Sequence, residues 1–284
     1  MGTCPSKDMA IGIVMFNPAK SKRLILNYYE MIKHLKEYPV FTLELVYPDR
    51  EPEISDAFHI YGKSVMFQKE NLCRILETKI PLKFTKIAFL DADLIFEPKW
   101  YSKASKALDT FQVVQLFTKC QWLDSDKTVM LERESVLKMK DSIWNSKYHP
   151  GFAWGFQRQW YKDVGFFDYA ISGSGDTLSA MKWLQKRIPP HFRSLPGPLK
   201  KLYAKYCPKP PKIACIDGTV QHLFHGSREN RKYTERHKML AFDEDITDLL
   251  TIENDLFEWK NPEKNTEFLN YFISRNDDEC LETS

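Results

Sequence analysis

Two aspartates one residue apart, Asp91 and Asp93, have the clearest chemical potential in this sequence. They directly follow the apolar run Lys86 to Leu90 (KIAFL), whose composition and length predict a buried strand. Carboxylates are hard anionic donors, and a turn after a strand lets both reach one divalent cation or a ribose hydroxyl. Aspartate is also a common turn residue, so the pair indicates a functional site only because it stands at the end of a predicted strand. That place predicts a metal or nucleotide site.

A second group of candidate ligands lies late in the chain, in the stretch HLFHGSRENRKYTER that begins at His222. Imidazole combined with carboxylate donors suits Mn²⁺ better than Mg²⁺. Residues three apart on a strand face opposite ways, so we expect only one of His222 and His225 to bind a metal. We choose His225, because the following Gly226 permits close approach to a phosphate.

Strand-like and helix-like segments alternate through the chain and must position these residues. The predicted strands cover 10–16, 41–47, 86–90, 113–117 and 213–216, and helical spacing marks 24–35, 72–76, 100–108, 177–185 and 269–273. This alternation predicts an α/β fold with a mostly parallel sheet flanked by helices. Ligands of such sheets bind beyond the carboxyl ends of the strands, where Asn17 and the aspartate pair stand.

Composition excludes several classes of function. The 284 residues carry a net charge of only +3, which is too weak to indicate a nucleic-acid partner. No apolar run approaches the roughly 20 residues of a membrane span, and no signal peptide is evident at the start. The 6 cysteines include no C-x-x-C pair, which predicts reduced thiols and disfavours zinc. We therefore expect a cytoplasmic protein without a membrane span.

Four segments, in order, resemble the glycosyltransferases of the GT-A fold. They are the strand–helix start at 10–47, FLDADLIF at 89–96, HPGFAWGFQRQWYKDVGFFD with GSGD at 149–176, and HLFHGSRENRKYTER at 222–236. Together they span about four-fifths of the chain. The resemblance implies a GT-A (Rossmann-like) fold with a smaller antiparallel acceptor-side part. It also implies a nucleotide-sugar donor, most often a UDP-sugar, a glycan acceptor, and manganese, with magnesium as the alternative.

The same resemblance implies one catalytic domain over residues 1–284. Its nucleotide-binding half would cover 10–118, and the half that binds the acceptor and completes the metal site would cover 119–240. A helical extension and an acidic tail would follow at 241–284. We expect the tail itself, 276–284, to be disordered.

Individual roles follow from this resemblance. The metal ligands would be Asp93, His225 and Asp91, where Asp91 would contact the metal through water or bind the ribose. The residues expected to contact the donor are Asn17, Tyr47, Lys69, Asp91, Ala92 and Arg228. Trp154 would stack on an acceptor sugar, with core packing as the alternative, and Gly175 would let the backbone approach that sugar.

Asp176, at the end of GSGD, is the candidate general base. An inverting transferase needs a carboxylate to accept the proton of the attacking hydroxyl. Asp176 could instead cap the helix predicted over Thr177 to Gln185, and the two roles are compatible. In a retaining enzyme Asp176 would only hold donor hydroxyls.

Two further alternatives stay open. A sugar-phosphate nucleotidyltransferase would share the sheet and the acidic metal site, but it normally has a Gly-rich loop after the first strand. Here that place, Asn17 to Lys22, contains no glycine. A catalytically inactive GT-A module that binds carbohydrate is the other alternative, and the intact acidic and histidine residues argue against it.

Overall fold

The computed structural model describes residues 7–188, 197–233, 235–240 and 246–281, and every structural statement below refers to these. Its centre is a seven-stranded sheet with the order β11-β6-β10-β4-β1-β2-β3. The strands are β1 (Met9–Phe16), β2 (Val40–Val46), β3 (Phe58–Tyr61), β4 (Lys86–Leu90), β6 (Val113–Gln115), β10 (Ala153–Gln157) and β11 (Ile213–Cys215). Within this sheet only β10 runs antiparallel to its neighbours.

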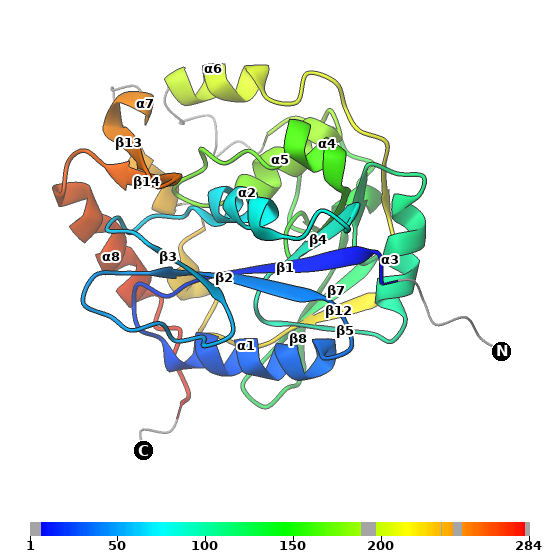
Figure 1. Cartoon of the computed structure of the whole chain (residues 1–284), viewed down its shortest axis with the longest axis horizontal. Coiled ribbons are helices and arrows are strands. Elements are labelled where there is room, and N and C mark those ends of the chain that lie inside the picture. Colours follow the sequence, from blue (N-terminus) through cyan, green and yellow to red (C-terminus); the bar gives the residue numbers. More distant parts are fainter. Residues whose placement is uncertain (1–6, 189–196, 234, 241–245, 282–284) are drawn as a thin grey trace.

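Helices cover both faces of the central sheet, with α1 and α2 on opposite sides of β1 and β2 (Figure 1). The helices are α1 (Lys22–Leu35), α2 (Lys69–Lys79), α3 (Trp100–Leu108), α4 (Arg158–Asp163), α5 (Gly175–Trp183), α6 (Gly197–Lys205), α7 (Ile246–Leu249) and α8 (Glu263–Ser274). Short 3-10 turns occur at Val136–Lys138, Glu229–Arg231 and Glu235–Leu240. No helix among the described residues is both long and apolar enough to cross a membrane.

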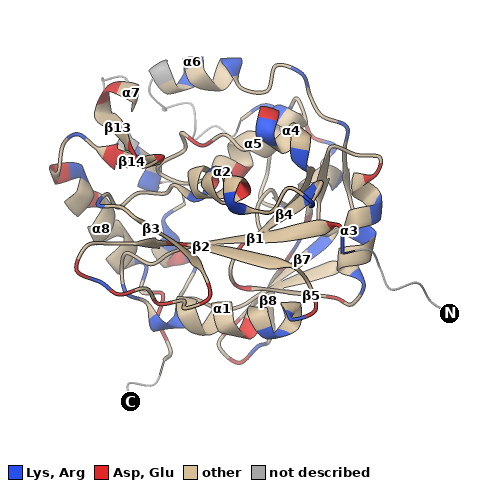
Figure 2. Cartoon of the chain, in the orientation of Figure 1, with Lys and Arg blue, Asp and Glu red and all other residues tan. Residues whose placement is uncertain are grey.

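Two apolar layers sandwich the sheet. Alternate side chains of β1 divide between them: Ala10 and Val14 belong to the layer with α2 and α5, and Ile11 and Ile13 to the layer with α1 and α3. A parallel sheet covered on both faces needs such continuous apolar strands. Figure 2 accordingly shows charged residues scattered over helices and loops, while the central strands are almost free of them. The predicted α/β class with a mostly parallel sheet is confirmed.

A second, smaller sheet has the order β5-β12-β7-β8-β9. Its strands are β5 (Leu94–Phe96), β7 (Lys119–Leu123), β8 (Val129–Ser135), β9 (Tyr148–His149) and β12 (Thr219–His222). It contains the antiparallel pairs β5–β12 and β7–β8, but β12–β7 and β8–β9 are parallel. A separate antiparallel hairpin joins β13 (Leu250–Glu253) to β14 (Leu256–Trp259).

The acidic tail departs from its prediction. Residues 276–281 are ordered, and Asp278 lies at the N-terminus of α1. Its carboxylate accepts hydrogen bonds from the Ser21 hydroxyl at 2.7 Å and from the backbone N–H groups of Lys22 and Arg23. Helix N-termini leave N–H groups without intrahelical partners, and a carboxylate there is stabilised by the helix dipole. The prediction of disorder is therefore wrong for 276–281, and residues 282–284 lie outside the described residues.

This contact predicts that the tail stabilises α1. Replacement in the variant Asp278→Ala should lower the free energy of unfolding by about 1 kcal/mol, because the capping carboxylate is lost. Urea denaturation measures the change. The matched control is Asp126→Ala, since Asp126 is an exposed acidic residue in a turn. Equal stability of the two variants would contradict this anchoring role.

Candidate functional site

A cleft of about 480 Å³ opens at the carboxyl edge of the central sheet. Its walls come from the end of β1, the turn after β4, the N-terminal turns of α2 and α5, and the chain that follows β12. Ligands of parallel α/β sheets bind at this edge, and the volume lies within the usual range for small-molecule sites.

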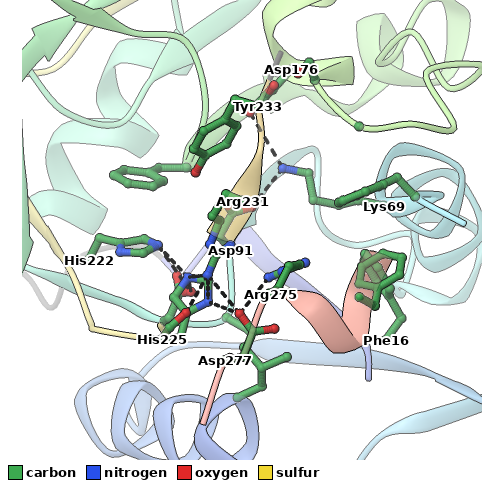
Figure 3. A pocket seen from close by; sticks show the side chains of 18 of the residues that line it. Phe16, Lys69, Asp91, Asp176, His222, His225, Arg231, Tyr233, Arg275 and Asp277 are labelled. Carbon is green, nitrogen blue, oxygen red and sulfur yellow. Dashed lines mark hydrogen bonds and ion pairs between the residues drawn. The ribbon is translucent and has the colours of Figure 1, made fainter. Parts of the chain in front are cut away.

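The side chains of Asp93, His222 and His225 converge in the cleft as a candidate metal centre. Figure 3 shows the two histidines close together. Asp93 Oδ2 lies 3.4 Å from His222 Nε2 and 3.1 Å from His225 Nε2. The two Nε2 atoms are 3.0 Å apart. Neighbouring donors that share one ion at about 2.1 Å stand about 3 Å from each other, so this spacing suits a single cation.

The antiparallel pairing of β5 with β12 produces this convergence. It sets His222 opposite Leu94, and the N–H of Leu223 donates to the Asp93 carbonyl at 2.9 Å. The strand ends at His222, so the chain turns before His225 and brings it back to the same side. The expectation that the two histidines face opposite ways is wrong, because strand alternation does not extend beyond the strand. His222 is thus a ligand candidate that our prediction left out.

The electrostatics of the triad favour a bound cation. Asp93 is buried, and its Oδ1 has no hydrogen-bond partner among the described residues. Burial alone would raise the pKa of Asp93, but His222 and His225 hold it below its ordinary value. Burial also lowers the pKa of His222 to about 3, although Asp93 opposes this. An ionised carboxylate and a neutral imidazole are the forms that bind metals, and an O,N,N donor set suits Mn²⁺.

Asp91 lies outside this triad and instead contacts Lys69. Lys69 Nζ is 2.9 Å from Asp91 Oδ1 and 4.0 Å from Asp176 Oδ2. Burial disfavours the charged amine, but the two carboxylates raise the pKa of Lys69 well above its ordinary value. Lys69 therefore stays charged and links the aspartate after β4 to the candidate base.

Asp176 lies in the first turn of α5, which begins at Gly175. Ser174 occupies the N-cap position, so Asp176 does not cap the helix as the alternative supposed. The backbone N–H of Thr177 donates to Asp176 Oδ1 at 2.6 Å and holds the carboxylate against its own turn. A Cβ added at Gly151 would collide with Asp176 Oδ2 and would lie 3.1 Å from His149 Nε2. Only glycine at position 151 leaves room for this carboxylate beside His149.

Four more of the residues predicted to bind the donor line the same cleft: Asn17, Lys69, Ala92 and Arg228. Asn17 also shapes the turn after β1, because its side chain exchanges hydrogen bonds with the backbone of Ser21. The strand-end rule placed Asn17 in the cleft, whereas Lys69, Ala92 and Arg228 were expected there from the family resemblance. Lining the cleft does not decide what each of them binds.

Three predicted contacts do not reach the cleft. Trp154 is 2% exposed, packs edge-on against Trp183 and donates its indole N–H to the Pro150 carbonyl, so a stacking role is contradicted. Tyr47 is buried, and the guanidinium of Arg50 lies over its ring. A Cβ at Gly175 would lie 2.6 Å from a carboxylate oxygen of Glu70, so this glycine permits helix packing rather than sugar contact. Trp154 and Tyr47 face away from the cleft because both belong to the apolar layer on one face of the central sheet.

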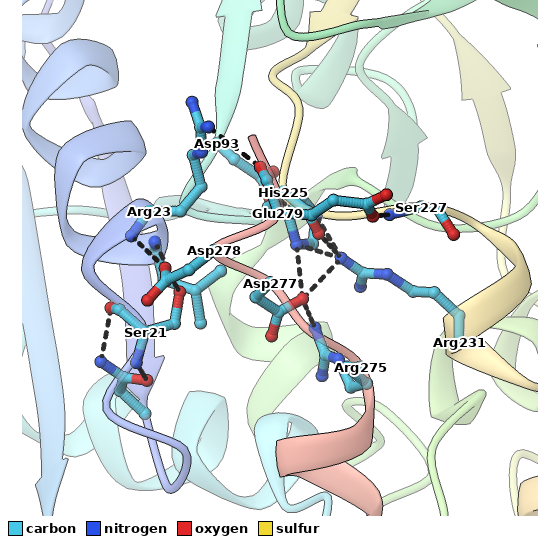
Figure 4. Close-up of polar contacts among 12 residues, drawn as sticks. Ser21, Arg23, Asp93, His225, Ser227, Arg231, Arg275, Asp277, Asp278 and Glu279 are labelled. Atoms are coloured by element: carbon cyan, nitrogen blue, oxygen red, sulfur yellow. Dashed lines mark hydrogen bonds and ion pairs between the residues drawn. The ribbon is translucent and has the colours of Figure 1, made fainter. Parts of the chain in front are cut away.

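Asp277, in the tail predicted to be disordered, lines the cleft and lies beside His225 (Figure 4). Its Oδ1 lies 3.4 Å from His225 Nδ1, 3.1 Å from Arg231 Nη2 and 3.2 Å from Arg275 Nη2. Burial would raise the pKa of Asp277, but His225 and Arg275 lower it to about 2. A carboxylate on Nδ1 fixes the imidazole with Nε2 toward the metal position. The sequence offers no pattern that reveals this contact.

No protein-family model and no curated protein matches the sequence. Among solved structures, it is similar to a mutant Drosophila β1,4-galactosyltransferase 7 in complex with manganese, UDP-Gal and xylobiose (13% identity, 63% of each chain, TM-score 0.36). It is also similar to GalNAc-T7 with UDP, GalNAc and Mn²⁺ (9% identity, 81% of this chain and 47% of that one, TM-score 0.44). A third is glucosyl-3-phosphoglycerate synthase from Mycobacterium tuberculosis with Mn²⁺, UDP-glucose and phosphoglyceric acid (12% identity, 83% and 79% covered, TM-score 0.43).

Each of these structures contains manganese together with UDP or a UDP-sugar. The chain spans 63% and 47% of the length of the first two. With TM-scores of 0.36 to 0.44 the likenesses do not assign an activity, so function has to be inferred from the site itself.

The position of Asp277 predicts a positioning role. Asp277→Asn should weaken Mn²⁺ binding about 10- to 100-fold, because His225 loses the carboxylate that orients it. Titration of the protein with Mn²⁺, followed by calorimetry, measures this. The control Asp278→Asn removes a charge from the same tail without touching His225 and should leave Mn²⁺ affinity unchanged. Equal Mn²⁺ affinity in wild type and Asp277→Asn would rule the role out.

Proposed function

We propose that this protein is a metal-dependent glycosyltransferase that moves a sugar from a nucleotide-sugar donor, with a UDP-sugar as the donor class, to a glycan hydroxyl. The observation that carries the proposal is the occurrence, in one cleft, of the Asp93–His222–His225 triad and of a separate carboxylate, Asp176. The first arrangement suits a cation that binds phosphate, and the second suits proton transfer.

The triad fits a Mn²⁺ ion with three protein donors. Three protein ligands leave coordination positions open, as catalytic metal sites require. When bound, the ion would supply Lewis-acid stabilisation of the charge that develops on the departing diphosphate. Asp93, His222 and His225 would hold it, with His225 oriented by Asp277.

Cationic side chains surround the same cleft. Arg231 and Arg275 line it close to the triad, and Lys69 lines it beside Asp91. Guanidinium groups pair well with phosphate oxygens, so these side chains support an anionic donor. The turn after β1, with Asn17, is the wall where we place the nucleoside, because parallel sheets receive nucleotides at this edge.

Asp176 is our general base for an inverting reaction. The Thr177 N–H holds its Oδ1, and the lack of a side chain at Gly151 leaves room for Oδ2. A carboxylate fixed in this way can accept the proton of an acceptor hydroxyl as that hydroxyl attacks the anomeric carbon. Lys69 Nζ lies 4.0 Å from Asp176 Oδ2 and pairs with this carboxylate.

A nucleotide panel tests the proposal. UDP, GDP, CMP and ADP are each added with Mn²⁺ or with EDTA, and thermal unfolding is followed. One nucleotide with Mn²⁺ should stabilise the wild type by about 2.7 kcal/mol at a hundredfold excess over Kd. Asp93→Asn should lose this response, because a charged metal ligand is gone. Stabilisation by a nucleotide that is unchanged by EDTA, or that remains in Asp93→Asn, contradicts the proposal.

The base is tested by the Asp176→Asn variant. We expect turnover to fall about 100- to 10,000-fold with Mn²⁺-dependent nucleotide binding unchanged, because only proton transfer is lost. NMR of the product's anomeric configuration reports inversion. Undiminished turnover, or a retained configuration, would remove Asp176 from this role. Release of pyrophosphate from UTP and a sugar 1-phosphate would instead identify a nucleotidyltransferase.

A further inference from the structure

Two arginines flank one tryptophan in the wall that the second sheet contributes to the cleft. Arg133, on β8, places its guanidinium carbon 5.2 Å from the ring centroid of Trp122. Arg228, from the chain after β12, lies 5.6 Å from the same ring. All three side chains line the cleft, and we call them the arginine–tryptophan subsite. Neither guanidinium has been used in the function proposed above.

Both arginines lack a compensating charge in the described part of the chain. Neither takes part in an ion pair there, and the Nε of each is buried without a hydrogen-bond partner. The glutamates beside Arg133 pair elsewhere: Glu132 contacts Lys119 at 2.9 Å, and Glu134 contacts Lys147 at 3.6 Å. Burial lowers the pKa of Arg133, and the neighbouring Arg228 lowers it further. Arginine nevertheless stays protonated in proteins, so two like charges face the cleft together.

Such an arrangement costs stability unless an anion occupies it. Partly buried charges without partners lose hydration and gain nothing in return. The nearby pair Arg231 and Arg275 shows the contrast, because each of them has an ion-pair partner in Asp277, at 3.1 and 3.2 Å. The arginine–tryptophan subsite is therefore built for an anionic group that comes from outside the chain, and two planar guanidinium forks suit phosphate, sulfate or carboxylate oxygens.

The neighbours of Trp122 place the subsite next to the acceptor position. Its ring lies 4.8 Å from the ring of His149, whose Nε2 stands beside Asp176 across Gly151. The same ring lies 6.1 Å from the ring of His222, a triad residue. An anion held here borders the candidate base as well as the metal site, and it lies on the wall of the second sheet rather than on the wall of β1 where we place the nucleoside.

We propose that Arg133 and Arg228 bind an anionic substituent of the acceptor, so that the acceptor is a sugar carrying a phosphate, sulfate or carboxylate group. This rests on the proposed transferase function and names the substrate class of the same site. Trp122 contacts both guanidinium groups through cation–π interactions, which keep the two groups together in the wall of the cleft.

The test compares charged and neutral sugars on the Mn²⁺–nucleotide complex of the full chain. Glucose 6-phosphate, glucose 6-sulfate, glucuronic acid and glucose serve as probes, and calorimetry measures their affinity. At least one anionic sugar should bind about 10- to 100-fold more tightly than glucose, since a charge-assisted hydrogen bond contributes that much. The preferred anion identifies the group.

Arg133→Gln should abolish the preference for the anionic sugar while leaving Mn²⁺–nucleotide affinity unchanged. Arg187→Gln, at an exposed arginine outside the cleft, is the matched control and should keep the preference. Two results would overturn the proposal. The first is equal binding of charged and neutral sugars by the wild type. The second is a loss of Mn²⁺–nucleotide affinity in Arg133→Gln, since Arg133 and Arg228 would then bind the donor diphosphate. Failure of the transferase proposal is recognised separately, because the wild type would then bind no nucleotide with Mn²⁺.

Discussion

The pairing register between β5 and β12 is the constraint on which the rest of the site depends. It sets His222 opposite Leu94, and the Leu223 N–H bonds the carbonyl of Asp93 itself. A slip of one residue would turn His222 to the opposite face of the sheet and separate it from the Asp93 carboxylate. Because β5 follows directly on the turn after β4, the same register ties the second sheet to the carboxyl edge of the first.

The C-terminal tail completes this arrangement from outside both sheets. Asp277 forms ion pairs with Arg231 and Arg275 and contacts His225. Asp278 caps α1, and Glu279 accepts a hydrogen bond from the backbone N–H of Ser227. One short acidic segment therefore joins the first helix of the chain to the loop that carries the last metal-ligand candidate. On this side Asp277 gives Arg231 and Arg275 an ion-pair partner, whereas Arg133 and Arg228 have none among the described residues. The first arrangement forms a preorganised metal site, and the second forms a surface that can bind an anion.

Much of the fold could be predicted because apolar periodicity is a local property. The runs that become β1, β4 and α3 contain enough β-branched or helically spaced apolar residues to define their elements without help from distant segments. The strand-end rule then located Asn17 and Asp93 at the cleft. The prediction that Trp154 stacks on a sugar failed for another reason. An aromatic side chain suits a sugar face and a protein core equally well, and here its packing against Trp183 shows that it belongs to the core.

The sequence by itself determined the α/β class, the position of the aspartate pair at a strand end and the presence of histidines late in the chain. Tertiary structure alone decided that both histidines face Asp93, that Asp277 contacts one of them and that Arg133 and Arg228 both contact Trp122. The reason is physical: elements follow from interactions between residues a few positions apart, whereas these contacts join segments far apart in the chain. Their geometry depends on strand register and on where a strand ends, which no local pattern of residues specifies.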